Sequence, residues 1–285
     1  MRRSPGIFLA AGLLAGFLAG CSGGLSARSK DPIQVDLALP AGTTKVRVWM
    51  PAGIIEVLVG EGPSLRFDGT SKRAANTDEQ LARLNKQPQL PTLTADPAEP
   101  GTAVLTFASA PADADLRACL VAYEGRLRLP ANLAVECRIE QAGQVTIEHR
   151  LADVTAHVGH GDLRVTDCQG RCEIFAGAGS TLVHNHSGDV RAKANAGEMQ
   201  IWMSKPGKEL RLQTGQGNVQ CHIPKDTSFR LDAFTAEGKA SAKAFGFDSV
   251  RSADFGATLT GQRGEGGTVI VMRASSGHLS LSPRQ

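Results

Sequence analysis

The sequence predicts an all-β protein built as a parallel β-solenoid, a fold in which short strands wind into stacked coils. From about Leu133 onward, short segments that alternate between apolar and polar residues recur, with starts about nine to eleven residues apart. Alternation with a period of two is typical of β-strands, and repetition at a fixed spacing is typical of coils that bury inward side chains on their neighbours. An antiparallel β-sandwich has similar strand spacing and stays the structural alternative.

A glycine corner recurs with these strands and favours the solenoid. Its clearest copies are Gly161-Asp-Leu-Arg-Val, Gly188-Asp-Val-Arg-Ala, Gly217-Asn-Val-Gln-Cys and Gly277-His-Leu-Ser-Leu. The repeated strands are expected at residues 135–139, 145–147, 154–158, 163–165, 173–175, 182–184, 189–192, 199–202, 210–213, 218–222 and 229–232. We therefore assign residues 126–285 to a β-solenoid repeat region.

Residues 32–125 form a second region with strands and one helical excursion. Strands are expected at 46–50 and 55–59, each next to glycine or proline, and later at 104–107, 119–123 and 126–129. Residues 76–85 begin with a capping residue and an acidic turn and place Leu81 and Leu84 three apart, which predicts a helix. The proline-rich stretch at 88–100 that follows is expected to be an irregular surface loop.

Composition places the chain among globular proteins. Of its 285 residues, 41% are hydrophobic and 21% charged, with 32 glycines and 14 prolines, which excludes a disordered, collagenous or multi-span membrane protein. The 31 basic and 28 acidic residues give a net charge of +3, and loss of Arg2 and Arg3 with a leader peptide would leave 29 against 28, or +1. Basic and acidic residues are interleaved, so no nucleic-acid partner is expected.

The first residues of the chain indicate export. Arg2 and Arg3 precede an apolar run from Ile7 to Ala19, and Gly20 and a cysteine follow. A charged, an apolar and a small-residue region in this order are typical of a secretory signal peptide, here residues 1–20. The apolar run is too short and too rich in glycine for a comfortable membrane span.

The end of this segment, Leu18-Ala19-Gly20-Cys21, resembles the lipobox of bacterial lipoproteins. The resemblance implies cleavage before Cys21, a diacylglycerol on its thiol and acylation, as by palmitate, of the new amine. Two or three acyl chains would anchor the protein to a membrane almost permanently. Ser22, where inner-membrane lipoproteins typically carry aspartate, favours the outer membrane, with the protein facing the periplasm or the cell surface. Residues 21–31 are small and polar and are expected to form a tether.

The order of elements resembles the DUF4097 family of suspected bacterial adhesins. The motifs that carry the resemblance are Leu39-Pro40-Ala41-Gly42, the helix near Gln80, Leu129-Pro130-Ala131-Asn132 and the glycine corners. The resemblance covers residues 32 to 285 and implies a β-solenoid lipoprotein of the cell envelope. It supplies no catalytic residues.

Five cysteines follow Cys21. They are Cys119, Cys137, Cys168, Cys172 and Cys221. In an exported protein Cys168 and Cys172, which flank a turn, could form a disulfide, as could Cys119 and Cys137 on successive strands. The alternative is that all five are buried thiols in the core.

Three groups of residues resemble reactive sites, and each also has a structural explanation. Cys168, Cys172 and His186 together would suit zinc, but no histidine pair has a zinc-binding spacing, so surface or turn histidines and no metal are expected. Glycine pairs such as Gly159 and Gly161 lack the third glycine of a nucleotide fingerprint and are expected to be corners. Asp162 and Asp189 hold matching positions in two corners, where aspartate usually bonds the turn backbone.

These observations favour a non-enzymatic, lipid-anchored envelope protein that presents its solenoid surface for adhesion, binding or scaffolding. The expected partners are the membrane, through the N-terminal lipid, and an envelope protein or glycan, and no cofactor is expected. One alternative is a carbohydrate-active β-helix lyase or hydrolase, because such enzymes build sites from stacked acidic and basic residues. The second alternative is a metal or redox sensor that uses Cys168, Cys172 and nearby histidines.

Overall fold

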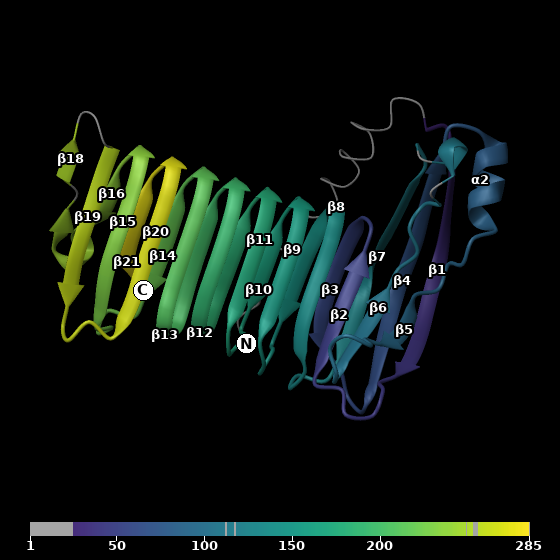
Figure 1. Ribbon diagram of the computed structural model, residues 1–285, viewed down its shortest axis with the longest axis horizontal. Helices are drawn as coiled ribbons and strands as arrows, with labels where there is room; N and C mark the ends of the chain where they lie inside the picture. Colours follow the sequence, from purple (N-terminus) through teal and green to yellow (C-terminus); the bar gives the residue numbers. More distant parts are fainter. Residues whose placement is uncertain (1–24, 112, 117, 249, 253–255, 285) are drawn as a thin grey trace, which may run out of the picture.

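The computed structural model describes residues 25–111, 113–116, 118–248, 250–252 and 256–284 as an elongated stack of β-strands (Figure 1). Strand makes up 66% and helix 5% of the structure, which confirms the all-β class. The strands are β1 (Ala27–Ala38), β2 (Lys45–Met50), β3 (Gly53–Val59), β4 (Ser64–Ala75), β5 (Thr92–Ala95), β6 (Thr102–Thr106), β7 (Leu120–Leu129), β8 (Ala134–Glu148), β9 (Val154–His160), β10 (Leu163–Thr166), β11 (Cys172–Ala178), β12 (Thr181–Ala196), β13 (Met199–Gln216), β14 (Val219–Ile223), β15 (Phe229–Glu237), β16 (Ala240–Ala242), β17 (Phe247–Asp248), β18 (Val250–Ser252), β19 (Gly256–Arg263), β20 (Thr268–Ser276) and β21 (Leu279–Pro283). The helices are α2 (Asp78–Asn85) and the 3₁₀ turns η1 (Ala114–Leu116) and η2 (Lys243–Phe245).

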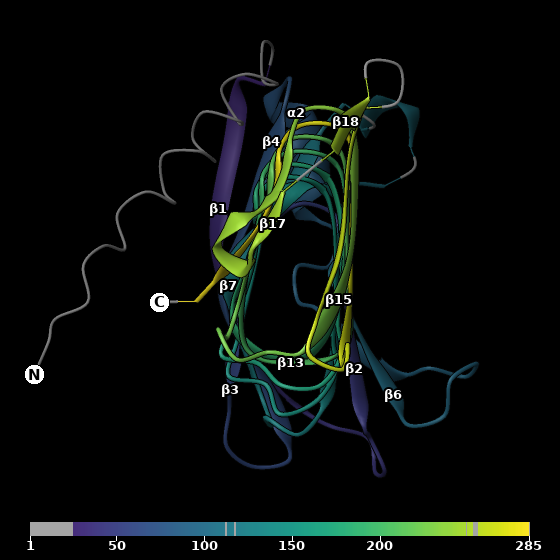
Figure 2. The same ribbon diagram turned by 90° about the vertical axis from the view of Figure 1, so that its left-hand side faces the viewer.

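Two sheets face each other across one core, as the view along the stack shows (Figure 2). Sheet 1 has the order β1, β4, β7, β3, β8, β10, β12, β13, β14, β21, β16 and β17. Sheet 2 has the order β5, β6, β2, β8, β9, β11, β12, β13, β20, β15, β19 and β18. The long strands β8, β12 and β13 turn the corner, so that each contributes one half to either sheet.

The strands in the body of the stack pair in parallel, which confirms the solenoid and excludes the antiparallel sandwich. Leu163 pairs with Val145 of the coil before and with Thr181 of the coil after. The coil that joins Met199 to its partner Val219 is slightly longer than the coil that joins Thr181 to its partner Met199. The closely spaced strand starts expected from the sequence are therefore half-coils, one half in each sheet. Among the described strands, antiparallel pairs occur only toward the two ends of the stack.

The core is formed by the inward residues of both sheets. Along β9 as far as Val158 and along β11 as far as Ala176, every second residue is buried, as the period of two requires. These side chains form one apolar cluster that extends from Ile33 to Leu281 and includes residues of both assigned regions. Residues 32–125 and the repeat region therefore share one core.

A column of stacked glycines forms one edge of the solenoid. Gly161, Gly179, Gly197 and Gly217 all have positive φ values, between 123° and 130°. A Cβ on each of them would lie between 1.8 and 2.2 Å from the carbonyl oxygen of the glycine one coil before. Only glycine allows this conformation and this approach, which confirms that the glycine pairs are corners.

Both ends of the stack have a coil inserted between its neighbours. The coil of β2 and β3 lies between β8 and the strands β6 and β7. The coil of β20 and β21 lies between the strands β13 and β14 and the strands β15 and β16. The first and last coils in sequence therefore have hydrogen-bonded neighbours on both sides, which protects them from fraying.

The helix expected at residues 76–85 is confirmed as α2. Thr77 caps it by accepting a hydrogen bond from the backbone N of Gln80 at 3.2 Å. The negative charges of Asp78 and Glu79 in the first turn interact favourably with the positive end of the helix dipole. Leu84 is the residue that α2 buries. The helix packs mainly against β4, at the end of sheet 1.

Two expectations about irregular segments are wrong in part. Residues 88–100 contain β5, which pairs antiparallel with β6, because the alternation at Thr92–Ala95 is sufficient for an edge strand between the prolines. Of the residues 21–31 expected to form a tether, 27–31 belong to β1, which begins at Ala27 and pairs with β4 over its whole length. Its first residues are polar because β1 lies at the edge of sheet 1.

Candidate binding surface

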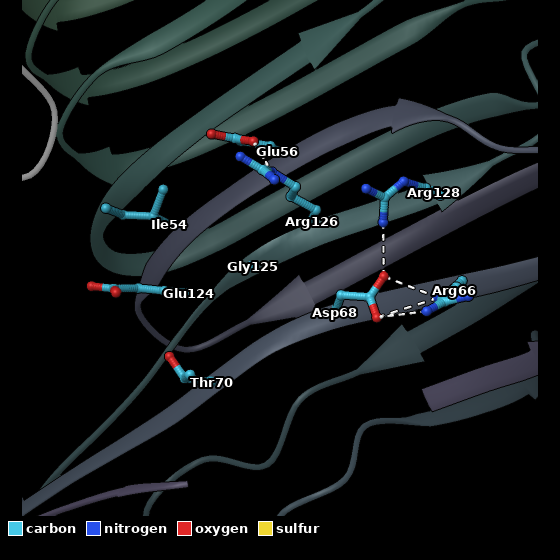
Figure 3. A pocket seen from close by; sticks show the side chains of 9 residues that line it. All are labelled: Ile54, Glu56, Arg66, Asp68, Thr70, Glu124, Gly125, Arg126 and Arg128. Atoms are coloured by element: carbon cyan, nitrogen blue, oxygen red, sulfur yellow. Dashed lines mark hydrogen bonds and ion pairs between the residues drawn. The ribbon is translucent and has the colours of Figure 1, made fainter. Parts of the chain in front are cut away.

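A shallow charged trough lies on the outer face of sheet 1, over β3, β4 and β7 (Figure 3). Its volume is about 760 Å³. The residues that line it are Ile54, Glu56, Arg66, Asp68, Thr70, Glu124, Gly125, Arg126 and Arg128. Alternation along the three strands turns these polar side chains outward and their apolar neighbours inward.

Ion pairs connect the charged groups of the trough. Arg126 Nε lies 2.9 Å from Glu56 Oε2, Arg128 Nη1 lies 2.7 Å from Asp68 Oδ2, and Arg66 Nε lies 3.0 Å from the same oxygen. At the edge of the trough Glu124 forms an ion pair with Lys72 of β4. Every carboxylate here thus has a cationic partner, an arrangement that suits polar binding better than proton transfer.

An aromatic cluster supports the floor of the trough. Gly69 and Gly125 lie opposite each other on β4 and β7, and a Cβ on either would lie 2.7 or 2.6 Å from Cζ of Phe67. The Phe67 ring contacts Phe107 edge-on with ring centroids 4.9 Å apart, and Phe107 lies 4.9 Å from Tyr123. The two glycines therefore make room for a packed ring beneath the charged surface.

Asp162 and Asp189 lie at different edges of the solenoid. Asp162 Oδ1 accepts a hydrogen bond from Ser180 N at 2.9 Å. Asp189 Oδ1 accepts hydrogen bonds from Lys208 N at 2.6 Å and Glu209 N at 3.0 Å. Asp162 follows the corner from sheet 2 to sheet 1, whereas Asp189 lies at the corner from sheet 1 to sheet 2. They bond the turn backbone, as expected, and do not form a carboxylate pair.

The five cysteines beyond Cys21 are free and buried in the structure. The pairings Cys168–Cys172 and Cys119–Cys137 are not formed in it, and the arrangement matches the alternative of packed thiols. Burial raises the pKa of Cys137 to about 12, and that of Cys221 to about 12 as well. Thiols of this kind are poor nucleophiles and poor metal ligands.

The histidines do not converge on a metal site. Within the described residues no group of three His, Cys, Asp or Glu side chains is arranged to hold a metal ion. His184 is exposed, whereas His186 is fully buried, with Nε2 3.1 Å from the carbonyl oxygen of Gly170. Asn185 between them has a positive φ of 55° and the register shifts there, so both rings cannot share a face. The expectation of a surface position is wrong for His186.

One polar residue that the sequence did not single out is Arg150, which is fully buried. Its guanidinium donates hydrogen bonds to the carbonyl oxygens of Leu129 at 3.1 Å and Leu133 at 2.9 Å, and to that of Pro130. Burial lowers its pKa to about 10. Arg150 therefore holds the turn between β7 and β8, which contains the second Leu-Pro-Ala element.

The lipobox and Cys21 lie outside the described residues. Within the described part of the chain, the helices are all too short or too polar to cross a membrane.

Comparisons with known proteins identify the family. Residues 133–282 match the family described as Toastrack DUF4097. Among solved structures, a suspected cell adhesion protein from Clostridium sporogenes is 12% identical, with 89% of this chain and 100% of that chain covered and a TM-score of 0.38. A suspected adhesin from Bacteroides fragilis is 9% identical, with 90% and 98% covered and a TM-score of 0.35. No curated protein matches the chain. Because the family match spans more than half of its length, this chain belongs to the Toastrack DUF4097 family.

Proposed function

We propose that this chain is a non-enzymatic envelope protein, anchored by lipid on Cys21, whose solenoid surface binds an envelope component or serves in adhesion. The observation that carries the proposal is the outer face of each sheet, which extends along the stack (Figure 1) and presents polar side chains, such as Arg66 and Asp68 on sheet 1 and Arg138 and Lys193 on sheet 2. The Toastrack family membership and the lipobox support an exported, surface-binding role.

The state of the acidic residues supports a role without catalysis. Glycan-cleaving enzymes hold two carboxyl groups at a defined separation, one of them as an acid with a raised pKa. Here Asp162 and Asp189 cap turns at different edges, and Glu56 and Asp68 in the trough are paired with arginines. None of these groups is arranged as an acid beside a second free carboxylate.

Two measurements test this function. Replacing Cys21 with Ser should leave an uncut precursor and abolish fatty-acid labelling, and normal labelling of that variant would contradict lipid anchoring. Detergent-purified wild-type protein should sediment with lipid-free envelope material in a saturable way. If the protein sedimented with none of the envelope fractions, this result would contradict the binding role.

A further inference from the structure

A row of four rings, three cations and one glutamine crosses the outer face of sheet 2. In spatial order it consists of Trp49, Arg138, His157, Phe175, Lys193, Gln213, Arg273 and Phe234, each paired in register with the next. These residues come from eight consecutive strands of the sheet. With strands about 4.8 Å apart, the row is about 34 Å long and runs parallel to the solenoid axis. It is hereafter called the ring–cation row.

The centre of the ring–cation row is a stacked pair of rings between two cations. The rings of His157 and Phe175 lie 4.6 Å apart at an angle of 11°. Arg138 and Lys193 are exposed on either side of this pair. Neither cation has a hydrogen bond or an ion pair among the described residues. Their positive charge is therefore available to a ligand.

In the neighbouring row of the same sheet the cations are paired with carboxylates. Arg47 there contacts Glu136 at 3.1 Å and Asp96 at 2.5 Å. Farther along, Arg211 contacts Glu209 at 2.6 Å. Arg273, at the far end of the ring–cation row, is likewise paired, with Asp232 at 2.5 Å. The unpaired positive charge of this part of sheet 2 is therefore concentrated at Arg138 and Lys193.

A groove of about 510 Å³ runs beside the stacked rings. Its polar lining includes Glu140 and Asn195, both exposed, and its floor includes Gly159 and Gly177. A Cβ on Gly177 would lie 1.9 Å from the carbonyl oxygen of Gly159, so the floor has no side chains at these two positions. The groove is open enough to accept a polymer chain along the row.

We propose that the ring–cation row binds an acidic polysaccharide, with sugar rings against His157 and Phe175 and sugar carboxylates on Arg138 and Lys193. This proposal rests on the proposed function and names the class of ligand. The two cations are three strand spacings apart, about 14 Å, so they would contact carboxylates on different sugars of one chain. Glu140 and Asn195 supply the acceptor and donor groups that sugar hydroxyls require.

The charge pattern favours a glycan over single-stranded nucleic acid. Nucleic-acid grooves follow the backbone with closely spaced cations, because every nucleotide carries a phosphate. The groove offers two unpaired cations, Arg138 and Lys193, over about 14 Å, and Glu140 would repel phosphates. Burial, with Arg138 adding to it, lowers the pKa of His157 below its ordinary 6.5, so its ring is neutral at pH 7.

Calorimetric titration of the full-length protein with hexagalacturonate tests the proposal at pH 7 and low salt. The methyl ester of the same oligosaccharide, which lacks the negative charge, should bind at least tenfold more weakly. A dT12 oligonucleotide should also bind at least tenfold more weakly than the acid. Equal binding of the ester, or tighter binding of dT12, would overturn the proposal.

Variants locate the site. The double variant Arg138→Gln with Lys193→Gln should weaken hexagalacturonate binding at least tenfold. The matched control, Arg28→Gln with Lys30→Gln, removes two exposed cations from β1 in sheet 1 and should bind as the wild type does. Phe175→Leu, which keeps an apolar side chain, should weaken binding about fivefold through loss of the ring. An equal loss in the control, or no loss in the first variant, would overturn the proposal.

The test separates this inference from the proposed function. If the wild-type protein sediments with envelope material but binds hexagalacturonate no better than the ester, the ligand class is wrong and the binding function stands. If it also fails to sediment with any envelope fraction, the proposed function fails as well.

Discussion

Gly179 lies directly on the carbonyl group of Gly161, one coil earlier. A Cβ on Gly179 would be 2.2 Å from that oxygen, and its φ of 130° belongs to glycine alone. The contact repeats along one edge of the solenoid, so the distance between coils at this edge is set by backbone-to-backbone packing.

Replacing Gly179 with Ala should therefore destabilise the protein by about 2 kcal/mol or more, because the new methyl group meets a carbonyl in a left-handed conformation. Urea unfolding followed by circular dichroism measures the change. Gly267→Ala is the control, since its Cβ would lie at an ordinary 3.4 Å from Ser228 O without a positive φ. Similar unfolding midpoints for both variants would contradict the glycine column.

Arg150 is expected to be essential for the turn between β7 and β8. Arg150→Met keeps much of the volume but removes the hydrogen bonds from the guanidinium to the carbonyls of Leu129, Pro130 and Leu133. The first two carbonyls keep a backbone N–H donor. Because a hydrogen bond from a charged donor contributes about 1.5–3 kcal/mol, we expect the loss of all three to cost at least about 3 kcal/mol. Arg171→Met, at an exposed position, is the control. A variant as stable as the control would show that the guanidinium does not hold this turn.

The five buried cysteines should all be free thiols in the folded protein. Burial raises the pKa of Cys137 and Cys221 to about 12, so at pH 8 they should not react with a thiol reagent until the chain is unfolded. Unfolding in guanidinium without reductant should then release five reactive thiols. A count of three or one would mean that Cys168–Cys172, Cys119–Cys137 or both are disulfides in the exported protein.

Stability should fall as the pH decreases below about 6.5. Burial lowers the pKa of His157, His186 and His222 below the ordinary 6.5. Below about pH 6.5 the unfolded chain then binds more protons than the folded chain. The contribution of these histidines to the free energy of unfolding is therefore full above pH 6.5 and is lost as the pH falls through their folded pKa values. Melting temperatures between pH 7.5 and 5 measure this decrease. His186→Gln, which keeps a donor for Gly170, should reduce the pH dependence, and an unchanged slope would exclude His186 as a source.

Local sequence patterns were sufficient to predict much of the fold. Three features depend on residues that are close in sequence, and all are confirmed: the alternation of inward and outward residues along the strands, the helix after Thr77 and the corners at Gly161 and Gly179. The insertion of β20 and β21 beside β13 and β14 was not predictable in this way. It joins residues that lie far apart in the sequence, such as Val219 and Leu279, and no local period encodes such a pairing.

The candidate site was predictable only in part. Asp162 and Asp189 were correctly interpreted as turn residues, yet their similar motifs concealed that they lie at different edges. Arg150 follows a strand and reads as a surface cation, because nothing local indicates three carbonyls from another turn. The ring–cation row became visible only when the register placed His157 beside Phe175 of the next coil.

Binding without catalysis is tested by incubating the purified protein with polysaccharides and isolated envelope material and measuring polysaccharide chain length and protein retention together. We expect saturable retention, no new reducing or unsaturated ends, and the same result for Asp162→Asn with Asp189→Asn. Cleavage of any polysaccharide that the double variant fails to perform would contradict it and establish the carbohydrate-active alternative.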